Sequence, residues 1–253
     1  MALRVLAVAV AGLAGCRTAV PIPRVVKIGL VGSFEGLYRS CGYEALYAAK
    51  AALADWNERG GVGGHPVELV ALDDSGSAAQ ARTQPAELAV DRDVLGVVGH
   101  ALRHTTAAAQ AEYAGLGLPL VSPTAWTGNP RSDGVFFAGA SYLHEALTAA
   151  QGAGLSPGAR LAVVGGGVAW LTRRVRWAAV VAPGQDVLSE TQAIVLDGPP
   201  DRAAEWARAY ARQGIPLVGG SDLGGDVFVA LAGDAAEGVY VARVALQADP
   251  AAW

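Results

Sequence analysis

Residues 25–74 read VVKIGLVGSFEGLYRSCGYEALYAAKAALADWNERGGVGGHPVELVALDD, and this stretch decides the fold. A short apolar run, Val25–Val31, precedes an alanine-rich segment, Tyr43–Glu58, whose apolar residues recur at intervals of three and four. A second apolar run follows at Pro66–Leu72. Short apolar runs predict buried strands, and the intervals of three and four predict a helix. The stretch is therefore expected to form a strand–helix–strand unit of a parallel sheet.

The alternation of strand and helix continues along the rest of the chain. Further strands are predicted at Leu95–Gly99, Leu118–Ser122, Arg160–Val164, Ala178–Val181, Ala193–Leu196 and Pro216–Val218. Further helices are predicted at Ala78–Asp91, Thr105–Leu116 and Pro200–Gln213, with one more opening at Ser141. The pattern predicts a first α/β lobe over 25–138, a compact second lobe over 139–236 and a return segment to the first lobe over 237–253, which holds a strand at Gly238–Val244. Val135–Ala138 is expected to be an extended crossing segment, with hinges near Phe137–Ser141 and Glu237–Val241.

The first sixteen residues are typical of a bacterial lipoprotein signal. Arg4 precedes the apolar run Val5–Ala14, which is too short to span a bilayer, and small residues then lead to Cys16. Leu13-Ala14-Gly15-Cys16 is similar to a lipobox, which predicts lipid attachment at Cys16, a tether over 17–24 and an extracytoplasmic, membrane-anchored protein. An ordinary secretory leader with an incidental cysteine is the alternative.

Composition disfavours several other classes of protein. The chain is 52% hydrophobic and 17% charged with a net charge of −4, and it has no basic stretch interleaved with aromatics, so nucleic-acid binding is not expected. With Cys16 lipidated, Cys41 has no disulfide partner, and two cysteines do not make a zinc site. His100 and His104 lack a third ligand of convincing spacing. No paired carboxylates or nucleophile elbow stand out, so neither an enzyme nor a cofactor is expected.

Three loops of the first lobe are expected at the carboxyl edge of its sheet, where open α/β sheets bind ligands. They are Gly32–Gly42, Gly99–Thr106 and Ser122–Pro130. The second loop places the hydroxyls of Thr105 and Thr106 at a helix start, where backbone N–H groups favour an anion. Thr105 serving simply as an N-cap is the alternative.

Several strings in order resemble the branched-chain amino acid type of periplasmic solute-binding protein. They are KIGLVGSFEG, WNERGGVGGHPVELVALDDSG, VVGH, PLVSPTAWTGNP and LVGGSDLGGDVFVALAGDAAEGVYV, and they run from about Val25 to Val241. The resemblance implies a two-lobed type I periplasmic-binding-protein-like fold, with parallel sheets flanked by helices. It also implies capture of a small solute, an amino acid or related carboxylate, by lobe closure for delivery to the permease of an ABC importer.

The resemblance also implies particular ligand-binding residues. Thr105 or Thr106 matches a serine that takes the ligand's carboxylate, and the backbone of Ala125 together with Thr127 completes that site. Asp222, or Ser221 on a one-residue shift, matches the acid that takes the ligand's ammonium group.

The chain departs from the family pattern in two aromatic positions and in length. A first-lobe aromatic falls near Cys41, where Tyr38 is close by, and Trp170 is the nearest aromatic to a second-lobe tyrosine. Family members continue well beyond GDAAEG, so a C-terminally shortened first lobe is expected. A ligand-sensing or degenerate lipoprotein of the same fold is the alternative function, and an α/β enzyme is a more distant one.

Overall fold

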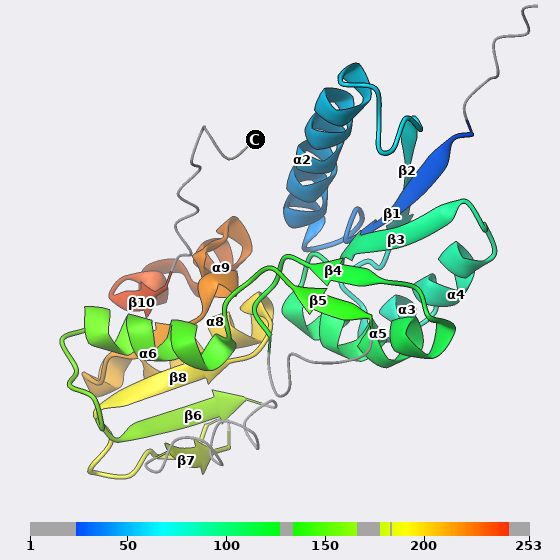
Figure 1. The fold of residues 1–253 in the computed structure, drawn as a ribbon. Coiled ribbons are helices and arrows are strands. Elements are labelled where there is room, and N and C mark those ends of the chain that lie inside the picture. The colour runs from blue at the N-terminus through cyan, green and yellow to red at the C-terminus, as the bar shows by residue number, and fades with distance from the viewer. Residues whose placement is uncertain (1–23, 127–133, 166–177, 183, 243–253) are drawn as a thin grey trace, which may run out of the picture.

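The structure is a computed structural model that describes residues 24–126, 134–165, 178–182 and 184–242. These residues form two α/β lobes that lie side by side (Figure 1). Each lobe is built on a five-stranded sheet whose neighbouring strands run parallel. The predicted fold class, parallel sheets flanked by helices in two lobes, is confirmed.

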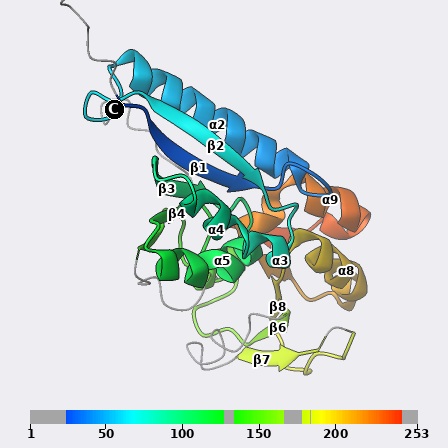
Figure 2. The ribbon, with the colours of Figure 1, turned by 90° about the vertical axis from the view of Figure 1, so that its right-hand side faces the viewer.

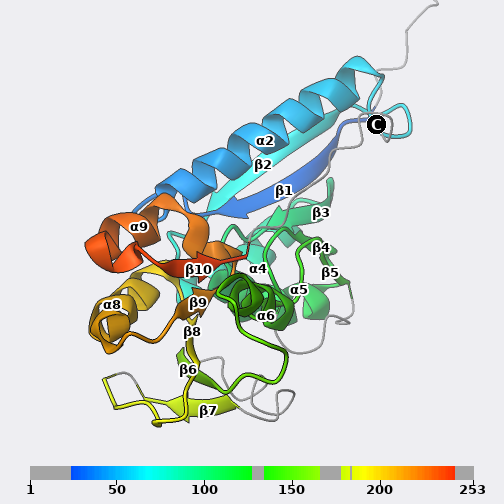
Figure 3. The same ribbon diagram turned by 90° about the vertical axis from the view of Figure 1, so that its left-hand side faces the viewer.

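The first lobe has the strand order β2-β1-β3-β4-β5. Its strands are β1 (Val26–Gly32), β2 (Val67–Asp73), β3 (Val94–Gly99), β4 (Leu120–Ser122) and β5 (Val135–Phe137). Its helices are α2 (Arg39–Glu58), α3 (Ala78–Ala81), α4 (Gln84–Ala89) and α5 (Arg103–Leu116). The long helix α2 lies along β1 and β2 on one face of the sheet (Figures 2 and 3). The other helices pack against the opposite face through a core that includes Val31, Leu88 and Tyr113.

The second lobe has the strand order β10-β9-β8-β6-β7. Its strands are β6 (Leu161–Gly165), β7 (Ala178–Val181), β8 (Ala193–Asp197), β9 (Leu217–Gly219) and β10 (Val239–Val241). Its helices are α6 (Tyr142–Gly152), α8 (Pro200–Tyr210) and α9 (Asp226–Ala232), with short 3₁₀ turns η1 (Ala211–Gln213), η2 (Ser221–Gly224) and η3 (Gly233–Ala236).

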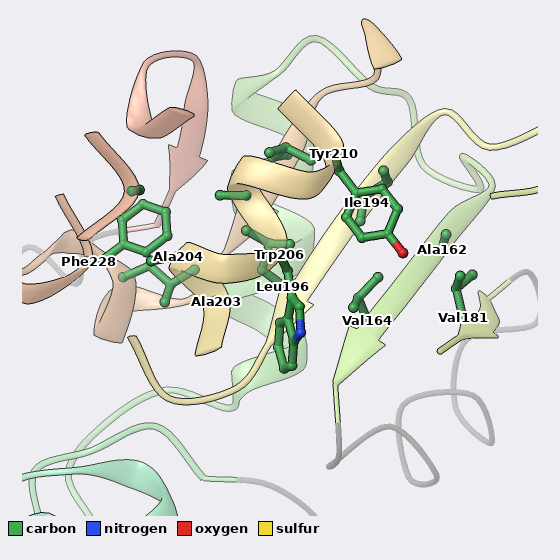
Figure 4. Packing of buried hydrophobic residues seen from close by; sticks show 14 residues of the cluster. Ala162, Val164, Val181, Ile194, Leu196, Ala203, Ala204, Trp206, Tyr210 and Phe228 are labelled. Atoms are coloured by element: carbon green, nitrogen blue, oxygen red, sulfur yellow. The ribbon is translucent and has the colours of Figure 1, made fainter. Parts of the chain in front are cut away.

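Strand β8 is buried along its whole length because both faces of the second sheet are covered. Successive side chains of a strand point to opposite faces. Ile194 and Leu196 therefore pack under α8, where Trp206 and Tyr210 reach the sheet (Figure 4). Val195 packs on the other side, under α6. This two-sided core fixes the carboxyl end of β8, where Asp197 lies.

Three expectations from the sequence need correction. The helix predicted at Ala78–Asp91 is split into α3 and α4, because Pro85 has no N–H to continue the hydrogen-bond ladder. The expected crossing segment, Val135–Ala138, begins as the edge strand β5 of the first sheet. The strand expected to return to the first lobe, within 237–253, instead pairs with β9 in the second sheet as β10. Residues 243–253 lie outside the described residues.

The chain crosses between the lobes at residues 138–141, just after β5. There the Trp126 N–H donates to the Ala140 carbonyl at 3.2 Å, and the Tyr142 N–H donates to the Trp126 carbonyl at 2.9 Å. A Cβ atom on Gly139 would lie 2.5 Å from the Thr124 carbonyl oxygen, so only glycine fits this close approach of two backbones. The crossing segment is thus held directly against the loop that follows β4.

Candidate ligand-binding cleft

A cavity of about 390 Å³ lies between the two lobes. Its first-lobe wall consists of Cys41, Glu44, Ala101, Leu102, Arg103, Pro123, Thr124 and Ala125. Its second-lobe wall consists of Pro200, Ser221, Asp222, Gly224, Gly225 and Val227. These residues follow the carboxyl ends of the parallel strands, the edge at which open α/β sheets bind ligands. Pockets for small molecules have volumes of about 300–1,000 Å³, so the cavity is large enough for a small solute.

Arg103, the first residue of α5, reaches from the first lobe to the second. Its Nη1 lies 2.8 Å from Asp197 Oδ1, and its Nη2 lies 3.3 Å from Asp222 Oδ2. Its guanidinium carbon stacks 4.0 Å from the centroid of the Tyr142 ring. The Arg103 side chain is only 12% exposed. The first-lobe guanidinium therefore contacts two carboxylates and one aromatic ring of the second lobe.

The carboxylates around Arg103 are not fully satisfied. Among the described residues, Asp222 Oδ1 and both carboxylate oxygens of Asp197 are buried without a hydrogen-bond partner, although Asp197 Oδ1 is in ionic contact with Arg103. Burial raises the pKa of Asp222, Arg103 lowers it and Asp197 raises it, and the net shift is upward. Burial lowers the pKa of Arg103, but the negative charge of Asp222 and its neighbours outweighs that, so the guanidinium stays charged. The cleft thus has spare acceptor capacity for a hydrogen-bond donor or a cation.

Glu145 in α6 fixes the turn that carries Asp222. The Ser221 N–H and the Ser221 hydroxyl each donate to the Glu145 carboxylate at 2.9 Å. The Glu145 side chain is almost fully buried, and burial raises its pKa although the Ser221 hydrogen bonds lower it. A carboxylate that accepts two hydrogen bonds from one residue orients that residue, so Glu145 sets the position of Asp222 in the cavity wall.

A buried network in the first lobe supports the loop that leads to Arg103. Asp74 Oδ2 lies 2.7 Å from His100 Nδ1, and Asp74 Oδ1 accepts hydrogen bonds from the Ser33 hydroxyl and the Gly76 N–H at 2.8 and 2.9 Å. Burial raises the pKa of Asp74, but these hydrogen bonds outweigh it and the net pKa is lowered. Asp74 therefore joins the segments that follow β1, β2 and β3.

Thr105 and Thr106, expected to bind a carboxylate, face the interior of the first lobe and do not line the cavity. The Thr105 hydroxyl donates to the Leu102 carbonyl at 3.0 Å. The Thr106 hydroxyl lies 3.0 Å from the same carbonyl and 3.3 Å from the Ser122 hydroxyl. Helix α5 begins at Arg103, two residues earlier than expected, and this turns Leu102 and Arg103 toward the cavity instead.

The other expected site residues divide into three groups. Ala125, Ser221 and Asp222 line the cavity. Tyr38 lies beside it, and its hydroxyl donates to Asp201 in the first turn of α8. Three expected residues lie outside the described part of the chain: Cys16, expected to carry the lipid, and Thr127 and Trp170, expected to bind the ligand.

Sequence reasoning missed Arg103 and Asp197. The sequence position of Asp197 could have predicted its place, because Asp197 is the first charged residue after the apolar run Ala193–Leu196. It therefore lies at the carboxyl end of a buried strand. Arg103 had none beyond its charge, because its direction depends on the residue at which α5 begins.

The family model described as periplasmic binding protein matches residues 25–191, which is more than half of the chain. The chain belongs to the periplasmic binding protein family. This family consists of solute-binding proteins and is non-enzymatic, so the expectation that the chain is not an enzyme is confirmed. The match covers the whole first lobe and, in the second lobe of this periplasmic binding protein, helix α6 and strands β6 and β7.

Relatives of the chain are named for branched-chain amino acids. The Leu/Ile/Val-binding protein of Escherichia coli (strain K12) is 29% identical over 100 residues, which are 40% of this chain and 27% of that protein. The crystal structure of the branched-chain amino acid transporter substrate-binding protein LivJ of Streptococcus pneumoniae, in complex with isoleucine, is similar with a TM-score of 0.63 at 22% identity. The alignment covers 83% of this chain and 68% of LivJ.

A periplasmic binding protein type 1 from Bordetella pertussis is similar with a TM-score of 0.66 at 20% identity, over 85% of this chain and 67% of that one. At these identities the solved structures establish the fold alone. The chain thus spans about two thirds of the solved structures that it resembles, and its match spans about a quarter of the curated relatives.

Two further features are absent from the described residues. In that part of the chain, no helix combines the length and the apolar character needed to cross a bilayer. Nor does it hold a group of three or more His, Cys, Asp or Glu side chains arranged to bind a metal ion. The Cys41 thiol is free and lines the cavity, and burial raises its pKa.

Proposed function

We propose that this periplasmic binding protein captures a small amino acid or a related carboxylate between its two lobes. The observation that carries the proposal is Asp222 Oδ1, a buried carboxylate oxygen without a hydrogen-bond partner among the described residues, in the wall of the interlobe cavity. A ligand ammonium group is the donor that such an oxygen favours. The Leu/Ile/Val-binding relatives make branched-chain amino acids the first candidates.

The N-terminus of α5 offers a place for the anionic end of the solute. Helix α5 has 14 residues, and its N-cap residue, Leu102, makes no side-chain capping bond. The first backbone N–H groups of a helix have no partner within the helix, and the helix dipole makes that end favourable for a carboxylate. Leu102 and Ala125 bring this end of α5 and the loop after β4 to the same cavity.

We propose further that the lobes close on the solute and present it to the permease of an ABC importer, with the protein held at the membrane by a lipid on Cys16. A solute that contacts both walls binds the closed form better than an open form, so binding shifts the population toward closure. Metabolic labelling with a fatty acid tests the anchor: label is expected in the wild-type protein and not in Cys16→Ser. Equal labelling of the two proteins would contradict lipidation at Cys16.

A thermal-shift screen against amino acids tests the binding function. A solute present at 100 times its Kd stabilises the protein by about 2.7 kcal/mol, which raises Tm by roughly 5–10 °C for a protein of this size. We expect such a shift with leucine, isoleucine or valine and a smaller shift with their amides, because the amide lacks the charge that α5 favours. No shift with any amino acid would contradict the proposal that the solute is an amino acid.

A further inference from the structure

The contact that links the two lobes most directly is the ion pair of Arg103. Arg103 belongs to the first lobe, while Asp197, Asp222 and Tyr142 all belong to the second. Asp197 is 1% exposed, so the guanidinium closes over a carboxylate that has little access to water. A planar guanidinium suits this position, because it can pair with carboxylates at its edge and stack on an aromatic ring with its face.

Asp197 and Asp222 can lie close together in a buried site only if a cation balances their charge. Like charges disfavour ionisation of each other, and burial disfavours both. Asp197 accordingly raises the pKa of Asp222, whereas Arg103 lowers it. The second-lobe half of the cleft is therefore a cation site, and in this structure the cation comes from the first lobe of the same chain.

The two halves of this ion pair are unequal. Arg103 Nη1 is 2.8 Å from Asp197 Oδ1, a normal charge-assisted distance, while Arg103 Nε and Nη2 are each 3.3 Å from Asp222 Oδ2. Asp222 Oδ1 meanwhile lacks any hydrogen-bond partner within the described part of the chain. Arg103 thus makes its hydrogen bonds to Asp222 Oδ2 and a close ionic contact with Asp197 Oδ1, while Asp222 Oδ1 stays open to a competing cation.

We propose that Arg103 is an internal substitute for the cationic group of a solute. Its ion pair with Asp197 and Asp222, which we call the clasp, holds the solute-free lobes together. A solute with an ammonium group competes with Arg103 at Asp222. The second statement rests on the proposed function, and the first does not. Arg103 is then a specificity-determining residue, because it reduces the advantage that an amino acid has over the same carboxylic acid without its amino group.

A second cross-lobe contact lies nearby and serves for comparison. The Tyr38 hydroxyl donates to Asp201, and the Tyr38 ring packs with Leu102 and with Val227 of α9. This contact is a neutral donor and a small apolar cluster, so Tyr38→Phe leaves the packing in place and removes one hydrogen bond. The ion pair carries more charge and is expected to matter more for closure.

Small-angle X-ray scattering of the solute-free protein tests the clasp. The wild type is expected to have the smaller radius of gyration, with Arg103→Gln expanded by a measurable amount and Arg103→Lys in between. Arg202→Gln removes the same charge from an exposed i,i+3 pair on α8 and is expected to match the wild type. Arg103→Gln with the wild-type radius of gyration would overturn the proposal.

Because Arg103→Gln leaves two buried carboxylates without their cation, a second variant guards against misfolding. The double variant Arg103→Gln/Asp197→Asn removes one charge of each sign and leaves Asp222 as the remaining carboxylate. It is expected to show the same expansion, with a wild-type circular dichroism spectrum. A folded double variant as compact as the wild type would likewise overturn the clasp.

Calorimetric titration with L-leucine and with 4-methylpentanoate, which differ by the ammonium group, tests the competition. The ratio of the two dissociation constants cancels any effect that the clasp has on closure as such. The preference for L-leucine is expected to be about 10-fold larger in Arg103→Gln than in the wild type, the worth of one charge-assisted hydrogen bond. An unchanged ratio would refute the competition. If neither probe binds either protein, the proposed function fails for these solutes, while the scattering result still decides the clasp.

Discussion

Gly139→Ala tests how the crossing between the lobes is built. Gly139 lies between β5 and α6, and an added Cβ would meet the Thr124 carbonyl oxygen at 2.5 Å and its carbon at 2.7 Å. Both atoms belong to backbone, which cannot rotate away as the end of a flexible side chain does. The loop after β4 or the crossing segment must therefore shift, and both flank the cavity.

The size of the effect follows from the overlap. Overpacking by one methyl group in a close-packed site costs about 1–3 kcal/mol. With an m-value of roughly 2 kcal/mol/M in urea, a loss of about 2 kcal/mol lowers the unfolding midpoint by about 1 M. Because Ala125 moves with the same backbone, solute affinity is expected to fall as well.

Urea unfolding followed by tryptophan fluorescence and circular dichroism measures the change. Gly115→Ala is the matched control, because Gly115 lies in α5 with nothing within 4 Å of an added Cβ. That substitution is expected to stabilise the protein by roughly 0.5–1 kcal/mol, the difference between glycine and alanine in a helix. A Gly139→Ala midpoint equal to or above that of the wild type would refute the reasoning about the crossing.

Three further predictions concern charge and packing. Asp74→Asn is expected to cost about 3 kcal/mol. Because the folded-state pKa of Asp74 is lowered, its contribution to the free energy of unfolding is present above the unfolded-state pKa of about 3.9 and is lost as pH falls through the folded-state pKa. The urea midpoints of wild type and variant should therefore converge in acid. A gap between the midpoints that does not change with pH would contradict the pairing of Asp74 with its hydrogen-bond donors. Solute affinity should decline on acidification at a pH above the usual carboxyl range, because the pKa of Asp222 is raised, and titrations that show no such decline would argue against Asp222 as the ammonium partner. Trp206→Ala should cost about 3–5 kcal/mol, since the Trp206 ring fills the space beside Gly198 under α8, and a loss below 1 kcal/mol would show that the second core collapses around it.

Much of the fold could be predicted from the sequence because strands β6, β8 and β9 of the second lobe are buried and helix α8 has clear ends. Pro200 begins α8, and Gly214, with a φ of 67°, ends the turn that follows it. The placement of β10 could not be predicted, because a three-residue strand carries no signal of which sheet it joins. That choice depends on pairing with β9, a contact that is distant in sequence.

The site was predicted in outline and not in detail. The three first-lobe loops expected at the carboxyl edge of the sheet follow β1, β3 and β4, and each contributes residues to the cavity wall, since that placement follows from topology. Which side chain of the β3–α5 loop faces the cavity depends on a rotation of 100° per residue along a helix. A start at Arg103 instead of Thr105 exchanges a buried hydroxyl for a guanidinium in the cleft.

Isothermal titration of wild type, Asp222→Asn and Asp226→Asn with leucine, isoleucine and valine tests the proposed function most directly. Asp226 is exposed in the first turn of α9, so its variant makes the same chemical change outside the cavity wall. The wild type and Asp226→Asn are expected to bind at least one of these amino acids in a 1:1 complex, with affinity reduced at least 10-fold in Asp222→Asn. Equal binding by all three proteins, or binding by none, would contradict the account.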